Sequence, residues 1–223
     1  MNRISPFLKE IYLNWRWLII FLVVLASAYI FVDLSGDVWL NEGFTWDIPI
    51  ILSIHQSSSP LLDTIFTMIT DTSGPIGIMI PVAIASLWLW RRNERFQMAT
   101  VIFSTVGMGI ITSVLKLIFQ RPRPDVFPPL VPQVSYSFPS GHTGSAVAFY
   151  GLMGVLLWHE GYYVAAVLCW VWVILVMLSR IYLGAHYPSD VLASLALGII
   201  WVVLLVLSNR RRTSGISSDV AFE

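Results

Sequence analysis

A histidine and an aspartate late in the chain are spaced so that they can act together. His186 and Asp190 are four residues apart, and Ser179-Arg180 precede them. Because Pro188 favours the first position of a helix, we expect His186 on a loop and Asp190 in the first turn of the following helix. A carboxylate there can accept the imidazole N–H, fix its tautomer and make the other ring nitrogen a better nucleophile. Taken alone, such a pair can equally form an ordinary structural hydrogen bond.

Two further segments carry groups that suit an anion. The sequence KLIFQRPRP begins at Lys116 and places Arg123 on the other side of a predicted helix end. The sequence FPSGH ends at His142 and opens another predicted helix, whose free backbone N–H groups and dipole favour an anion. Ser140 can cap this helix or bind a phosphate oxygen. An ordinary helix start is the alternative for the second segment by itself.

The elements that must position these residues are predicted to be membrane-spanning helices. Of the 223 residues, 57% are hydrophobic and 12% are charged, and the mean hydropathy is +0.75. The apolar residues form long uncharged runs, most of which approach the roughly 20 residues that cross a bilayer. The sequence therefore predicts an all-α, polytopic membrane bundle. Its six expected transmembrane helices cover residues 17–32, 72–90, 96–115, 141–158, 161–179 and 191–209.

Basic residues predict how this bundle lies in the membrane. With six spans, three clusters fall on one side: Arg3, Lys9 and Arg16; Arg91, Arg92 and Arg95; and Arg210, Arg211 and Arg212. Cytoplasmic loops are enriched in Lys and Arg, so we expect this side, and both termini, in the cytoplasm. The remaining four of the 13 basic residues lie at the external side, where together they indicate an anion site: Lys116, Arg121, Arg123 and Arg180. A basic residue at a span end can alternatively extend to the membrane interface.

The segments KLIFQRPRP, FPSGH and SRIYLGAHYPSD together resemble the type 2 phosphatidic acid phosphatase and haloperoxidase superfamily, in its integral-membrane lipid phosphatase branch. The resemblance is close over residues 116–190 and looser for the six spans. It implies that His186 attacks phosphorus to form a phosphohistidine, that Asp190 orients His186, and that His142 protonates the leaving alcohol. It also implies a set of groups that bind the phosphate oxygens: Lys116, Arg123, Ser140, Gly141 and Arg180.

No metal or other cofactor is expected. The acidic residues of the predicted external loops are scattered, and they are Asp33, Asp37, Glu42, Asp47, Asp63 and Asp71. Cys169 is the single cysteine and falls within a predicted span. The expected partners are a lipid phosphate substrate and membrane lipids, and no obligate protein partner is evident. A formal net charge of zero argues against nucleic-acid binding.

The predicted function is hydrolysis of a lipid phosphomonoester or diphosphate at the external face of a bacterial plasma membrane. The resemblance implies phosphatidate, phosphatidylglycerol phosphate or undecaprenyl diphosphate as substrate, and the sequence does not choose among them. One alternative is a non-catalytic lipid-binding or transport protein. Another is a vanadate-dependent haloperoxidase, but the haloperoxidases that share this site are soluble.

Several regions receive simpler interpretations. Residues 1–212 are expected to form the phosphatase domain, and residues 213–223 a disordered tail. The external segment 34–71 contains apolar residues at helical spacing, which predict an amphipathic helix that either covers the site or anchors at the membrane surface. Arg121 and Asp125 lie outside the matched motifs and are interpreted as solvated loop charges. The two other histidines, His55 and His159, are interpreted as ordinary loop residues.

Overall fold

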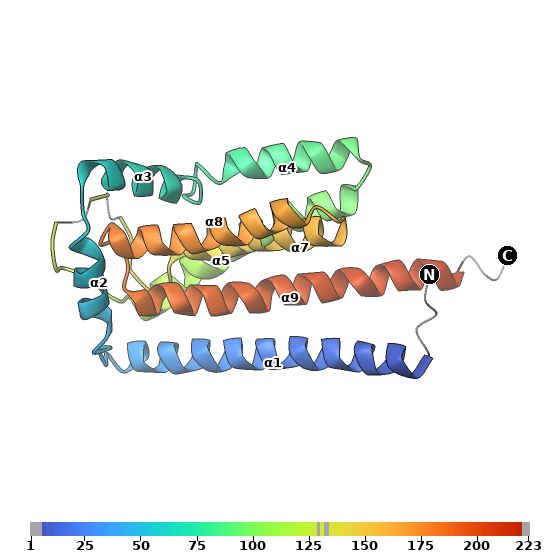
Figure 1. Ribbon diagram of the computed structural model, residues 1–223. Coiled ribbons are helices and arrows are strands. Elements are labelled where there is room, and N and C mark those ends of the chain that lie inside the picture. The colour runs from blue at the N-terminus through green and yellow to red at the C-terminus, as the bar shows by residue number, and fades with distance from the viewer. Residues whose placement is uncertain (1–5, 129, 132–133, 220–223) are drawn as a thin grey trace.

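The computed structural model describes residues 6–128, 130–131 and 134–219, which form helices and connecting loops (Figure 1). No strand occurs among these residues. The helices are α1 (Pro6–Trp39), α2 (Asp47–His55), α3 (Pro60–Asp71), α4 (Met79–Arg91), α5 (Arg95–Phe119), α6 (Gly141–Ala146), the π-helix η1 (Val147–Gly151), α7 (Leu152–His159), α8 (Tyr163–Tyr182) and α9 (Pro188–Asp219).

The all-helical membrane bundle predicted from the sequence is confirmed. Four stretches in the described part of the chain are long and apolar enough to cross a membrane, and they are Trp15–Trp39, Arg95–Phe119, Tyr163–Tyr182 and Pro188–Ser208. The other two predicted spans have a different form. The helix expected over 72–90 begins only at Met79, and the helix expected over 141–158 consists of α6, η1 and α7 in succession. Six spans therefore stay a prediction.

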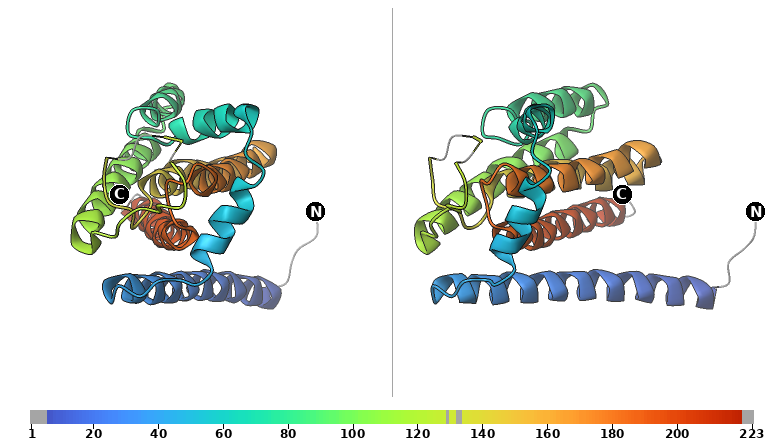
Figure 2. Two further views of the ribbon diagram at one scale, coloured as in Figure 1. Left: turned by 90° about the vertical axis from the view of Figure 1, so that its left-hand side faces the viewer. Right: turned by 60° about the vertical axis from the view of Figure 1, so that its left-hand side comes forward.

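The helices are arranged so that one end of the bundle is covered by a crosswise element. In Figure 1, α1, α8 and α9 run along the bundle, whereas α2 runs across its left-hand end. Figure 2, left, looks onto this end and shows α2 passing in front of the neighbouring helices. The loop between α5 and α6 and the short turn between α8 and α9 lie at the same end. These loops carry parts of all three segments that the sequence singled out.

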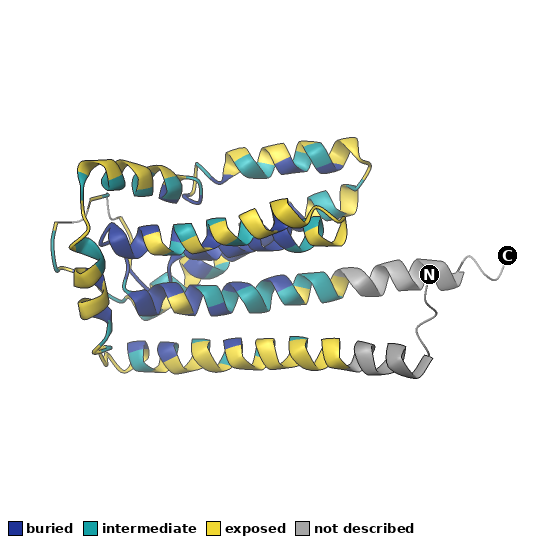
Figure 3. Cartoon of the chain, viewed as in Figure 1, coloured by how far each residue is buried: buried dark blue, intermediate teal, exposed yellow. Residues whose placement is uncertain are grey.

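The apolar core lies where α4, α5, η1, α8 and α9 meet, and its fully buried members include Leu89, Val101, Val147, Leu152 and Val176. Much of the outer surface is also apolar, and α1 is mostly exposed (Figure 3). Since exposed apolar side chains on a bundle of this length suit lipid rather than water, the distribution fits a membrane protein. At the α2 end, by contrast, the buried residues include several polar and charged ones.

The predicted amphipathic helix in segment 34–71 is present as α3. Ser59 caps it by accepting a hydrogen bond from the Leu62 N–H at 3.4 Å, and a proline occupies the first position. Its inner face packs on α8, where the Tyr182 hydroxyl donates to Asp63 at 2.6 Å and the Phe66 ring lies 4.4 Å from the Tyr182 ring. Helix α3 is therefore docked on the bundle. Of the two predicted roles for this segment, the docking favours covering the site over anchoring at the membrane surface.

Two predictions remain untested: the orientation of the bundle in the membrane, and the division of the chain into a domain and a tail. The α4–α5 turn, with Arg91, Arg92 and Arg95, lies at the end of the bundle opposite α2 (Figure 1). Its assignment to the cytoplasm, together with both termini, stays a prediction. Helix α9 continues to Asp219, beyond the predicted domain end at 212. Residues 220–223 of the predicted tail lie outside the described residues, as does Arg3.

Candidate active site

The turn between α8 and α9 places His186 beside Asp190. Helix α8 ends at Tyr182, and the backbone N–H of His186 donates back to the Arg180 carbonyl at 3.2 Å. Gly184 has a φ of +66°, a conformation that glycine adopts without strain and that closes this tight turn. Helix α9 then begins at Pro188, as the sequence predicted. As a result, Nδ1 of His186 lies 3.4 Å from Oδ2 of Asp190, with side chains that are 1% and 0% exposed.

The Asp190 carboxylate is held by several donors that leave it facing the imidazole. Its Oδ2 accepts hydrogen bonds from the Ser137 hydroxyl and from the Tyr187 backbone N–H, the latter at 3.0 Å. Its Oδ1 accepts from Nη1 of Arg121 at 2.5 Å. Because a carboxylate oxygen accepts, Nδ1 donates a hydrogen bond to Oδ2, and the ring nitrogen Nε2 then keeps its lone pair. This is the tautomer that a histidine nucleophile needs.

Nε2 of His186 faces the basic residues of the first motif. Nη1 of Arg123 lies 3.3 Å from this nitrogen and also donates to the Ala185 carbonyl at 2.6 Å. Lys116, in the last turn of α5, donates to the carbonyls of Tyr136 and Ser137. The long α5–α6 loop thus folds back over both cations and holds them near His186.

Arg180 is the third basic residue at this position and is almost completely buried. Its side chain is 3% exposed, and Nη1 donates to the Thr70 hydroxyl of α3 at 2.8 Å. Its Nε has no hydrogen-bond partner among the described residues. A buried guanidinium with a free N–H group is costly unless an anion completes it. The side chain is therefore suited to a phosphate oxygen.

The FPSGH segment starts a helix against this cluster. Ser140 caps α6, where its hydroxyl accepts from the Thr143 N–H at 3.4 Å, and its own N–H donates to the Asp190 carbonyl at 3.3 Å. A Cβ placed on Gly141 would lie 3.9 Å from Cε of Lys116. His142 follows, and a Cβ placed on Gly74 would approach its Nε2 to 3.2 Å. The turn between α3 and α4 therefore covers the outer edge of His142.

The surroundings of His186 favour its neutral form. Burial, and then the positive charges nearby, hold the pKa of His186 well below its ordinary value near 6.5. The charges belong to Arg180, Lys116 and Arg123. A neutral imidazole with a free Nε2 lone pair, next to three cations, can attack an electron-poor centre that carries anionic oxygens. All eight residues proposed from the sequence are thus gathered at one end of the bundle.

Arg121 is not the solvated loop charge that the sequence suggested. Its side chain is only 11% exposed and bridges two buried carboxylates, those of Asp190 and Asp47. Sequence reasoning also missed Ser137, whose hydroxyl lies 3.4 Å from Nδ1 of His186. Arg121 was one of four basic residues predicted to lie on the external side, and this excess of charge was the available signal. Asp125 is exposed, as expected.

The other residues considered from the sequence take no part in the contacts of this cluster described above. His55 and His159 are the last residues of α2 and α7 rather than loop residues, and His55 stacks on Phe127 with ring centroids 3.6 Å apart. Within residues 6–128, 130–131 and 134–219, no three His, Cys, Asp or Glu side chains are grouped to hold a metal ion. Cys169 is a free, half-buried thiol on α8. Independence from metals and cofactors stays a prediction.

Similarity to known proteins identifies the family. The profile of the PAP2 superfamily matches residues 97–214. The chain belongs to the PAP2 superfamily. Phosphatidylglycerophosphatase B of Bacillus subtilis is 30% identical over 188 residues, which cover 78% of this chain and 89% of that protein. Lipid A 1-phosphatase of Rhizobium johnstonii is 36% identical over 116 residues, which cover 48% of this chain and only 45% of that protein.

The fold of a solved PAP2 protein agrees with this assignment. The crystal structure of a transmembrane PAP2 type phosphatidylglycerolphosphate phosphatase from Bacillus subtilis superposes with a TM-score of 0.76 at 23% identity. The superposition covers 84% of this chain and 96% of that one. The resemblance seen in the sequence is confirmed: this PAP2 chain is an integral membrane hydrolase, a phosphatase of lipid phosphates. The alternative of a non-catalytic binding or transport protein is set aside.

Proposed function

We propose that the chain hydrolyses a lipid phosphate at the external membrane face through a phosphohistidine on Nε2 of His186. The observation that carries the proposal is the position of this ring. Its Nδ1 lies 3.4 Å from Asp190 Oδ2, and its Nε2 lies 3.3 Å from Arg123 Nη1. One nitrogen is oriented by a carboxylate, and the other points to where cations would hold a phosphate.

In the first step, the lone pair of Nε2 forms a bond to phosphorus while the bond from phosphorus to the leaving oxygen breaks. His142 gives its proton to that oxygen. In the second step, the oxygen of a water molecule forms a bond to phosphorus while the bond from phosphorus to Nε2 breaks and returns its electron pair to the ring; a proton of the water goes to His142, and inorganic phosphate leaves. Asp190 stabilises the positive charge that the His186 ring carries between the two steps.

Charge stabilisation of the phosphoryl group comes from several donors. Lys116, Arg123 and Arg180 neutralise the non-bridging oxygens, aided by the Ser140 hydroxyl and the Gly141 N–H at the start of α6. Phosphoryl transfer depends mainly on such fixed donors and on positioning. Three cations supply enough positive charge for a phosphate dianion without a divalent metal ion.

Phosphatidylglycerol phosphate is the proposed first substrate. The support is that the similarity to phosphatidylglycerophosphatase B extends over 89% of that protein, whereas similarity to the lipid A phosphatase covers only 45% of it. Phosphatidate and undecaprenyl diphosphate are the other substrates to compare. Each presents a phosphate at the membrane surface, where the buried cations lie.

The test is phosphate release by detergent-purified protein in EDTA from these three lipids, for wild type, His186→Ala and a matched histidine control, His159→Ala. We expect release by wild type and the control, none by His186→Ala, and the highest kcat/KM for phosphatidylglycerol phosphate. An acid-labile phosphoprotein should appear in wild type only. Activity that persists in His186→Ala would overturn the mechanism, and activity abolished by EDTA would overturn the metal-free site.

A further inference from the structure

We propose that Asp47 and Arg121 are positioning residues for the reaction: Asp47 on α2 fixes Arg121, and Arg121 fixes Asp190. The proposal rests on the proposed function in one respect, that Asp190 orients the nucleophile His186. It gives helix α2 a role in catalysis. Asp47 lies outside the three segments that the sequence singled out, and Arg121 lies within the first of them but was not among the proposed catalytic or phosphate-binding residues.

The guanidinium of Arg121 joins two carboxylates with separate nitrogens. Nη1 donates to Asp190 Oδ1 at 2.5 Å and to the Ser189 hydroxyl at 2.7 Å. Nη2 donates to Asp47 Oδ2 at 2.9 Å. The fork of an arginine has a rigid, planar geometry, so fixing one nitrogen fixes the direction of the other. Asp47 therefore determines where Arg121 presents Nη1 to Asp190.

Asp47 also holds the start of α9 directly. Its Oδ1 accepts the backbone N–H of Ser189 at 2.9 Å, and its Oδ2 accepts the Ser189 hydroxyl at 2.6 Å. The first N–H groups of a helix have no partner within the helix, and a carboxylate is favoured there. Asp47 thus caps α9 from another helix, one residue before Asp190. Its side chain is 2% exposed.

Aromatic rings confine the guanidinium from two sides. The Arg121 guanidinium lies 4.1 Å from the centre of the Tyr187 ring and 5.4 Å from that of Phe44. Tyr187 follows the nucleophile His186 directly, and its backbone N–H is one of the donors to Asp190. Stacking of this kind adds attraction and limits rotation of the arginine plane.

The charges explain why two carboxylates are needed. Asp190 can stabilise a positively charged His186 ring only while its own negative charge is not neutralised by a stronger partner. Arg121 alone would neutralise it. Because Asp47 offsets the charge of Arg121, Asp190 keeps its charge for the ring while its Oδ1 stays hydrogen-bonded. Loss of Asp47 would leave Arg121 buried with a single carboxylate.

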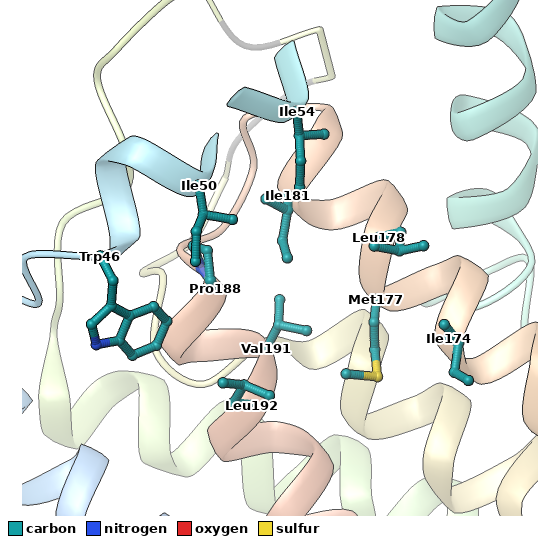
Figure 4. A pocket seen from close by; sticks show the side chains of 10 residues that line it. All are labelled: Trp46, Ile50, Ile54, Ile174, Met177, Leu178, Ile181, Pro188, Val191 and Leu192. Atoms are coloured by element: carbon teal, nitrogen blue, oxygen red, sulfur yellow. The ribbon is translucent and has the colours of Figure 1, made fainter. Parts of the chain in front are cut away.

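Apolar packing does not fix α2 by itself. A pocket of about 420 Å³ lies between the α2 side and α8 and α9. Figure 4 shows Trp46, Ile50 and Ile54 lining it on the α2 side, opposite apolar side chains of α8 and α9. An interface that contains such a space lacks part of the contact that fixes neighbouring helices. The polar bonds of Asp47 lie next to this pocket, since Trp46 and Pro188 line it. Ile51 of α2 is also fully buried against Ile181 and Val191, and we assign the rest of the fixed position of α2 to the bonds of Asp47.

The experiment measures kcat, KM and inhibition by inorganic phosphate for Asp47→Asn, Arg121→Gln and the double variant. We expect kcat to fall on the order of 10- to 100-fold, by analogy with the loss seen when the hydrogen-bond partners that orient metal-ligating histidines are removed. KM and the phosphate inhibition constant should change less than about threefold, because Lys116, Arg123 and Arg180 are untouched. The double variant should be no slower than Arg121→Gln alone, since both residues act through one contact.

Arg121→Lys and an exposed pair serve as controls. Lysine keeps the charge but cannot donate to both carboxylates in one plane, so kcat should stay reduced in a folded protein. Arg92→Gln and Glu160→Gln remove an ion pair at the opposite end of the bundle and should leave kcat unchanged. If Asp47→Asn and Arg121→Gln keep wild-type kcat while His186→Ala is inactive, the inference is wrong and the proposed function stands. A fall in kcat with an equal weakening of phosphate inhibition would show a purely structural role and also overturn it.

Discussion

The two ends of the helical bundle carry ion pairs of the same chemical type in very different surroundings. At the α2 end, Arg121 binds Asp190 and Asp47, whose side chains are 0% and 2% exposed. At the other end, Arg92 binds Glu160 at 2.7 Å, with side chains that are 36% and 33% exposed. Exposed pairs contribute little because water screens them, whereas removing one partner of a buried pair costs about 3–5 kcal/mol.

The difference shows that burial, rather than the presence of charge, separates the α2 end, which holds the proposed site, from the opposite end. Buried charges are expensive, so the positions where the chain accepts them are candidates for function. At the α2 end the charges are connected to one another through Ser137, Ser189 and Tyr187. At the opposite end Arg92 contacts only Glu160, Tyr162 and the Trp88 ring among the interactions described.

The largest effect is expected from the carboxylate that faces the nucleophile. Asp190→Asn should lower kcat by about 10³- to 10⁴-fold, because an amide can donate to Nδ1 and stabilise the wrong tautomer of His186. The measurement is phosphate release under saturating lipid, with Glu160→Gln as the matched change at the opposite end. A decrease below tenfold, with the protein folded, would mean that Asp190 does not orient the ring and that the two ends are functionally alike.

The sequence separation of two contacting residues decides whether their contact at the α2 end could be predicted. Ser140 as a cap and Pro188 as a helix start depend on neighbouring residues, and local rules placed both correctly. The contact of Arg121 with Asp47 joins residues 74 positions apart. Spacing rules do not reach that far. Only the packing of α2 across the bundle brings these two side chains together.

One helix boundary was missed for a local reason. The predicted span began at residue 72, whereas residues 72–78 form turns and α4 begins at Met79. The sequence there reads SGPIG, which is rich in turn residues. A Cβ on Gly77 would lie 1.7 Å from the Asp71 carbonyl oxygen, so the turn requires glycine. Hydropathy averaged over the span concealed this signal, and with it the turn that covers His142.

A second prediction, at the α2 end, distinguishes a role of Arg180 in the reaction from a role in the stability of the fold. Arg180→Gln removes a donor to the transferring phosphoryl group and should lower kcat by about 10²- to 10³-fold. The melting temperature of the empty protein should not fall, because burying a cation is costly and Arg180 has no carboxylate within 4 Å among the described residues. Thermal unfolding in detergent, measured beside kcat, checks both halves. A large loss of stability would show that Arg180 serves the fold rather than the substrate.

The pH dependence provides a third measurement. An exposed histidine titrates near pH 6.5, but the pKa of His186 is held well below 6.5, first by burial and then by nearby cations. Since the neutral ring is the proposed nucleophile, the loss of kcat/KM that protonation of His186 causes should set in only below pH 6.5. The substrate phosphate itself titrates near pH 6, so its ionisation is followed separately by ³¹P NMR. A decline centred near 6.5 that does not follow the substrate would contradict a buried, neutral His186.

The smallest effect is expected at the end opposite the site. Arg92→Gln and Glu160→Gln should leave kcat within about twofold of wild type, because surface substitutions away from buried networks change little. The melting temperature should also stay the same, since water already screens this pair and the Trp88 ring can pack on a glutamine stem as well. If either variant lost activity to the extent that Arg121→Gln does, coupling would extend along the whole bundle. Burial would then no longer distinguish the charges that serve catalysis from those that follow membrane topology.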